Sequence, residues 1–126
     1  MIFKELEKNV IQWAEEKSLL AKDNSYQQYA KFQEESNEIL IALNNNKKVL
    51  EKAQKLDVTN EAELKIFRDI RKDFENELKD AFGDTLVTLI ILAKQNELKL
   101  EECLEYAYNE IKNRTGKTIN GTFIKD

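Results

Sequence analysis

Three glutamates, a lysine and two glutamines lie close together in the stretch QYAKFQEESNE, residues 28–38. On a helix with 3.6 residues per turn, Lys31, Glu35 and Glu38 share one stripe with Gln28, at the border of an apolar face. Carboxylates beside a core are costly unless something pairs with them. The pattern is therefore compatible with a divalent cation held by Glu35 and Glu38, and also with a plain solvated helix face.

A second row of acids leads directly into an apolar run. One helical stripe there carries Glu77, Asp80, Asp84, Val87 and Ile91. If this row faces the first, the like charges raise one another's pKa values and destabilise the fold, and a hard cation removes that cost. Oxygen ligands favour magnesium, manganese or calcium. Because bound Mg²⁺ polarises phosphoryl groups and activates water, metal-assisted hydrolysis is the reaction class that these residues permit.

Composition excludes most other chemistry. The chain has no histidine and one cysteine, Cys103. It therefore lacks the Ser-His-Asp and Cys-His nucleophile systems and the Glu-x-x-His pairs of di-iron bundles, and it disfavours zinc or copper. Cys103 lies on an apolar helical stripe, which favours a small buried hydrophobe over a nucleophile.

Length and charge indicate one helical domain. The 126 residues form a single unit, 1–126, with a C-terminal tail from about residue 115. No proline, three glycines and 35% charged residues favour long amphipathic helices. The net charge of −4 argues against nucleic-acid binding. Without a signal peptide or an apolar run of the ~20 residues that span a bilayer, we expect a cytoplasmic protein with no membrane contact.

Hydrophobic periodicity predicts an all-α fold, a bundle of four main helices. The first helix covers about residues 2–20, with Trp13 as a core anchor. The second begins at Ser25, which fits a capping box with Gln28, and ends near residues 44–46, because three consecutive asparagines are poor helix formers. Residues 47–56 then form a short separate helix.

The third helix starts at the N-cap Asn60 and runs to about Asn96, as one long helix or two. Gly83 within it indicates close packing or an approaching group. The fourth helix covers about residues 100–112 and has a single apolar stripe, and the tail after it is expected to be irregular. The stripe consists of Leu100, Cys103, Leu104, Ala107, Tyr108 and Ile111.

Three motifs together resemble the MazG-like nucleoside triphosphate pyrophosphohydrolases, especially the small single-domain members of phages and prophages. The similarity extends from Trp13 to the C-terminus. The motifs are Gln28-x-x-Lys31-x-x-Glu34-Glu35-x-x-Glu38, Asp80-Ala-Phe-Gly-Asp84-Thr-Leu-Val, and Tyr108-Asn109-Glu-Ile-Lys112-Asn-Arg114-Thr-Gly-Lys117. The resemblance implies an all-α enzyme that uses Mg²⁺, with Mn²⁺ as a substitute, to hydrolyse a nucleoside triphosphate to the monophosphate and pyrophosphate.

Carried over by position, the resemblance makes Glu35, Glu38 and Asp84 metal ligands, with Glu34 as an adjacent catalytic acid. The family's ExxD glutamate would fall at position 81, which is alanine here. Asp80 is expected to supply the fourth ligand, and Glu77 is a second candidate.

The resemblance also implies substrate contacts. Lys31, Asn109, Lys112 and Arg114 become candidates for phosphate contacts, with Lys31 also in a catalytic role, and Trp13 becomes a candidate contact for the base. Each cation also has a structural explanation. Lys31 can pair with a glutamate on its own helix, and Lys112 and Arg114 suit a helix C-terminus.

The oligomeric assembly usual in the family that the motifs resemble, together with the long helices, implies a homodimer or homotetramer with its site near the interface. Residues 45–76 are longer than compact members need and suit an extended bundle or an oligomer contact. Two other functions stay open. One is a related all-α dUTP or dCTP hydrolase, and the other is a helical interaction module without catalysis.

Overall fold

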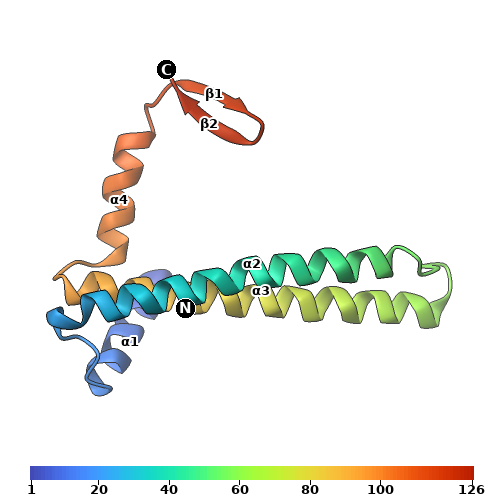
Figure 1. Cartoon of the computed structure of the whole chain (residues 1–126), viewed down its shortest axis with the longest axis horizontal. Helices are drawn as coiled ribbons and strands as arrows, with labels where there is room; N and C mark the ends of the chain where they lie inside the picture. The colour runs from blue at the N-terminus through green and yellow to red at the C-terminus, as the bar shows by residue number, and fades with distance from the viewer.

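The computed structural model describes residues 1–126 and contains four α-helices and one β-hairpin. In order, these elements are α1 (Phe3–Glu16), the 3-10 turn η1 (Lys22–Asn24), α2 (Ser25–Ala53), α3 (Glu61–Gln95), α4 (Leu100–Ile111), β1 (Gly116–Ile119) and β2 (Thr122–Lys125). α2 and α3 form a long antiparallel pair, α1 packs against α3, and α4 projects away from the end of α3 with the hairpin at its tip (Figure 1). The mostly helical fold with four main helices is confirmed.

The second predicted helix does not stop at the three asparagines. α2 is one continuous helix over Ser25–Ala53, so the predicted break at residues 44–46 and the separate short helix are wrong. α2 packs along α3 beyond this point, and Ala42 and Ala53 are buried on either side of it. Helix propensity is a weak preference that such packing overrides.

α3 begins and ends close to the predicted bounds. The Asn60 side-chain oxygen accepts hydrogen bonds from the backbone N–H groups of Ala62 at 2.9 Å and Glu63 at 3.2 Å, so the predicted N-cap is confirmed. The helix continues through Gly83, where an added Cβ would have no atom within 4 Å. The close packing expected at Gly83 is therefore absent.

The first connection differs from the prediction. α1 ends at Glu16, short of the predicted residue 20. Ser25 and Gln28 do not form the predicted capping box, because the Ser25 hydroxyl donates to the Lys22 carbonyl and the Gln28 side chain reaches α3. Trp13 is 48% exposed, so it is not the predicted core anchor within one chain.

The tail is ordered rather than irregular. β1 and β2 pair antiparallel, with Gly116 opposite Lys125. Asn120 and Gly121 form the turn with φ values of 51° and 77°. An Asn-Gly pair with positive φ at both residues is the preferred two-residue hairpin turn, and this signal was available in the sequence.

The core of the single chain is thin. Its buried apolar residues are Ala14, Ala42, Ala53, Ala81, Ile90 and Ile91, and no large side chain is completely buried. None of the helices combines the length and the apolarity needed to cross a membrane.

Candidate metal centre

Three carboxylates meet where α2 faces α3. Glu35 and Glu38 come from α2 and Asp84 comes from α3, and one carboxylate oxygen from each lies within 4.8 Å of the other two. Oxygens that share a Mg²⁺ ion at 2.0–2.1 Å lie at most about 4 Å apart, so small side-chain rotations would bring these oxygens to ligand distance. The predicted meeting of acids from two separate helices is therefore present in the structure.

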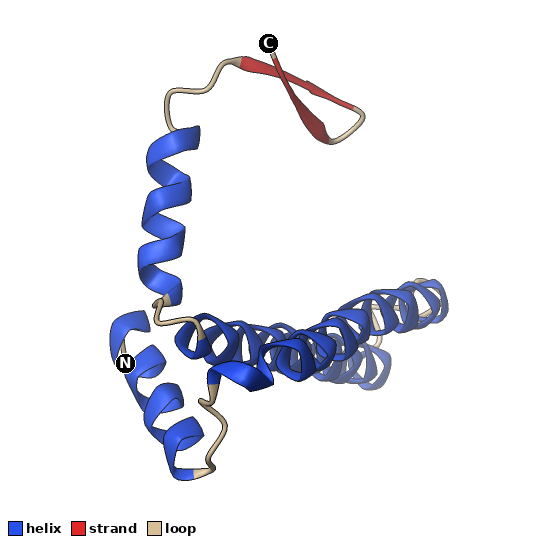
Figure 2. Cartoon of the chain, turned by 60° about the vertical axis from the view of Figure 1, so that its left-hand side comes forward, coloured by secondary structure: helices blue, strands red, loops and turns tan.

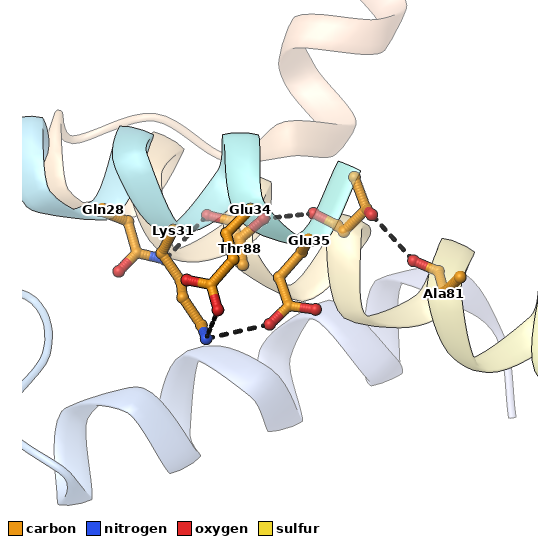
Figure 3. Close-up of polar contacts among 7 residues, drawn as sticks. Gln28, Lys31, Glu34, Glu35, Ala81 and Thr88 are labelled. Atoms are coloured by element: carbon orange, nitrogen blue, oxygen red, sulfur yellow. Dashed lines mark hydrogen bonds and ion pairs between the residues drawn. The ribbon is translucent and has the colours of Figure 1, made fainter. Parts of the chain in front are cut away.

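A hydrogen bond between the helices sets their register beside this cluster. The Gln28 side-chain nitrogen donates to the backbone carbonyl of Thr88 at 3.2 Å (Figure 3). Because the two helices are antiparallel, two turns onward along α2 leads to Glu35, and one turn back along α3 leads to Asp84. Gln28 thus positions the acids and is not itself a member of the acid cluster.

Lys31 balances part of the negative charge. Its ammonium group lies 3.0 Å from Glu35 and 3.5 Å from Glu34, as Figure 3 shows. The hydrogen bond to Glu35, followed by the charge of Glu34, raises the pKa of Lys31. The predicted ion pairing within α2 is therefore confirmed, and Glu35 is the acid nearest to the lysine.

The surroundings of Asp84 raise its pKa. Desolvation is the largest cause of its raised pKa, followed by the charges of Asp80 and Glu35, while Lys31 acts in the opposite direction. Neighbouring negative charges make the ionised carboxylate less favourable. A bound cation would stabilise that ionised form.

Asp80 does not join the three carboxylates, although it was the predicted fourth ligand. It lies one turn before Asp84 on α3, about 6 Å along the helix axis, and acts on Asp84 as a neighbouring charge. Glu77, the second candidate, lines a separate groove with Asn46 and Phe74. The structure thus brings together three of the four predicted metal ligands.

The predicted substrate contacts are divided between distant parts of the chain. Asn109 and Lys112 lie at the far end of α4, where the Lys112 ammonium donates to the Asn109 side chain at 3.2 Å, and Arg114 follows them. This end points away from α2 and α3 in both views (Figures 1 and 2). Within one chain, Asn109, Lys112 and Arg114 therefore do not lie beside the acid cluster. Trp13, the predicted contact for the base, lies on α1.

Glu7 has a structural role that the sequence reasoning missed. Its side chain is buried, and one carboxylate oxygen accepts hydrogen bonds from the backbone N–H groups of Leu100 at 2.8 Å and Glu101 at 3.3 Å. A carboxylate at a helix N-terminus satisfies free N–H groups and suits the helix dipole. The available signal was an acid on the inward stripe of α1, between Phe3 and Val10.

Comparison with known proteins assigns this chain to no family. The chain matches no family model, no curated protein and no solved structure. What the site can do follows from its chemistry, which is three oxygen donors on two packed helices beside a lysine. Such a set suits a hard divalent cation and, through it, a phosphate.

Proposed function

We propose that this chain is a Mg²⁺-dependent nucleoside triphosphate pyrophosphohydrolase. The observation that carries the proposal is the meeting of Glu35, Glu38 and Asp84 oxygens within 4.8 Å across two helices. The resemblance of the three motifs to the MazG-like enzymes supports the same reaction. The products are the nucleoside monophosphate and pyrophosphate.

Each acidic or basic residue of the cluster has a role in this proposal. Glu35, Glu38 and Asp84 hold the Mg²⁺, which when bound polarises a phosphoryl group and lowers the pKa of water. Mn²⁺ is the expected substitute because it also takes oxygen ligands. Glu34, whose side chain is 65% exposed beside the cluster, is available to accept a proton from the attacking water. Lys31 neutralises developing phosphate charge.

The phosphate contacts beyond Lys31 require another subunit. Asn109, Lys112 and Arg114 lie on and after α4, away from the acids of their own chain. Arginine suits bidentate phosphate contact and lysine supplies a point charge. We therefore propose a homodimer or homotetramer in which these residues serve the acid cluster of a neighbouring subunit.

A substrate panel tests the reaction. Purified protein with Mg²⁺ and each common ribo- and deoxyribonucleoside triphosphate should release pyrophosphate together with the monophosphate. A strong preference for dUTP or dCTP would favour the related all-α hydrolases. Release of orthophosphate instead would contradict the proposed bond cleavage, and no turnover with any divalent metal would favour a non-catalytic interaction module.

Variants of the acids test the site. Glu38→Gln and Asp84→Asn should each lower kcat at least about 100-fold, because each removes a metal ligand, with no loss of thermal stability. Glu51→Gln, an exposed acid elsewhere on α2, is the matched control and should keep full activity. Full activity of both site variants would refute this assignment.

A further inference from the structure

The single chain exposes far more surface than its mass requires. Its accessible surface is 10060 Å² for 14.8 kDa. A compact monomer of this mass exposes about 7,000 Å². The excess of roughly 3,000 Å² is several times the about 800 Å² per partner of a standard interface. The fold therefore carries surface that another molecule can cover.

One part of this surface is an apolar groove in the half of the α2–α3 pair remote from α1. The groove has a volume of about 900 Å³. Six apolar side chains line it, namely Leu50, Leu64, Phe67, Ile70, Phe74 and Leu78. We call it the distal groove.

The edge of the distal groove is basic. Arg68, Arg71 and Lys72 line it together with a single acid, Glu75. The guanidinium of Arg71 also lies 6.0 Å from the centre of the Phe67 ring, so it covers part of the apolar floor. An occupant of this groove should have an apolar stripe flanked by acids.

α4 has these properties. Its predicted apolar stripe is largely uncovered, with Leu104 67%, Tyr108 59% and Ile111 51% exposed. Figure 2 shows the helix standing clear of the α2–α3 pair. Its twelve residues include four glutamates and no lysine or arginine. α4 is thus complementary to the distal groove in both hydrophobicity and charge.

Lengths also agree, and they exclude full occupation of the groove within one chain. α4 is about 18 Å long, and the groove spans about 21 Å from Leu64 to Leu78. The near end of the groove lies about 26 Å along α3 from Gln95, where the short link to α4 begins. Even with the four-residue link fully extended, α4 of the same chain could reach only the near part of the groove. Only the α4 of another copy can therefore fill the whole groove.

We propose that α4 of one copy occupies the distal groove of a second copy, and that a twofold axis makes the exchange reciprocal. Two equivalent contacts then form one closed, self-complementary dimer. The proposal rests on the groove and on α4, and it does not depend on the chain being an enzyme.

Charge reversal tests this interface. One variant carries Arg68→Glu and Arg71→Glu in the groove, and the other carries Glu105→Lys and Glu110→Lys on α4. Each alone should raise the dimer dissociation constant by about 30-fold or more, because like charges then face each other. Mixing the two variants should restore a heterodimer, because opposite charges then meet at both contacts. Sedimentation with one labelled variant measures this.

A matched control reverses two charges outside the groove. Lys48→Glu and Lys52→Glu lie on the side of α2 opposite Leu50 and should dimerise as the parent does. Circular dichroism verifies that all variants remain helical. A monomeric parent, or reversed variants that dimerise like the control, would overturn the proposal.

A cross-linking measurement does not depend on charge reversal. Cys103, on the apolar stripe of α4, is the only cysteine. Ile70→Cys adds a thiol to the groove, and a short bismaleimide should link the two chains efficiently. Ile66→Cys, which is exposed on α3 outside the groove, is the control. Equal linking of both variants would contradict docking in the groove.

Discussion

The ionisation of Asp84 responds to its surroundings in the folded chain. Desolvation, then Asp80 and then Glu35, raise its pKa above the ordinary value of 3.8, and Lys31 partly offsets them. Because the folded-state pKa is the higher one, the protonated form of Asp84 favours the folded state. This contribution is complete at low pH and is lost as pH rises through the raised pKa.

This shift predicts the pH dependence of an Asp84→Asn variant. In EDTA, the variant and the parent should have similar melting temperatures near pH 4. At pH 7 the variant should melt about 1–3 °C higher, since it lacks a repulsion that costs a few tenths of a kcal/mol. Saturating Mg²⁺ should remove or reverse the difference. A parent that is more stable than the variant at pH 7 in EDTA would contradict the clustering of charges.

At the proposed metal site, Lys31 and Mg²⁺ would compete for the same carboxylate. Lys31 lies 3.0 Å from a Glu35 oxygen. Lys31→Met should therefore bind Mg²⁺ about three- to tenfold more tightly, because a nearby positive charge is removed. Its kcat should nevertheless fall if Lys31 contacts substrate phosphate. Calorimetric titration with Mg²⁺ measures the affinity, with Lys48→Met as the control, and weaker binding would count against a metal at Glu35.

The elements are placed by a few long-range polar contacts rather than by a large core. Gln28 joins α2 to the Thr88 carbonyl of α3, and the Gln95 side chain donates to the Leu19 carbonyl at 2.8 Å. Glu7 holds the start of α4. Each of these contacts ties together segments far apart in the sequence, so a substitution at any of them should weaken the attachment of one element to another.

Because Glu7 contacts the start of α4, removing its side chain should disorder α4 locally. Glu7→Ala should cost about 1–2 kcal/mol, because two backbone N–H groups lose a buried acceptor. Glu7→Gln keeps an acceptor oxygen and should cost less. Hydrogen exchange at the Leu100 and Glu101 amides should accelerate in the alanine variant. Glu5→Ala, an exposed change in the same helix, is the control, and unchanged exchange in Glu7→Ala would show that α4 is held by other contacts.

The whole molecule is an extended hairpin of helices with an uncovered α4. If a second copy covers these surfaces, stability depends on protein concentration. The melting temperature should rise by about 2–3 °C for each tenfold increase in concentration, because dimer formation stabilises only the folded chains. Scanning calorimetry at several concentrations measures this. The groove-reversed variant should lose the dependence, and a concentration-independent parent would indicate a stable monomer.

The sequence by itself determined the local structure and the composition of the site. Helical periodicity, the Asn60 cap and the spacing of Glu35 and Glu38 on one helix are properties of neighbouring residues, so they can be deduced without a fold. The absence of histidine likewise limits the metal chemistry to oxygen ligands. The hairpin turn at Asn120-Gly121 is also a local feature, and the Asn-Gly pair would have predicted it from the sequence.

The tertiary structure alone decided how the elements meet. It showed that α2 continues as a helix through three asparagines because it packs along α3. It also showed that Asp80 stays outside the carboxylate cluster and that the rest of the chain leaves α4 largely uncovered. These features depend on helix register and on contacts between residues such as Glu7 and Leu100, more than 90 positions apart. Local propensities carry no information about such pairs, because the free energy that selects them arises only when distant surfaces come together.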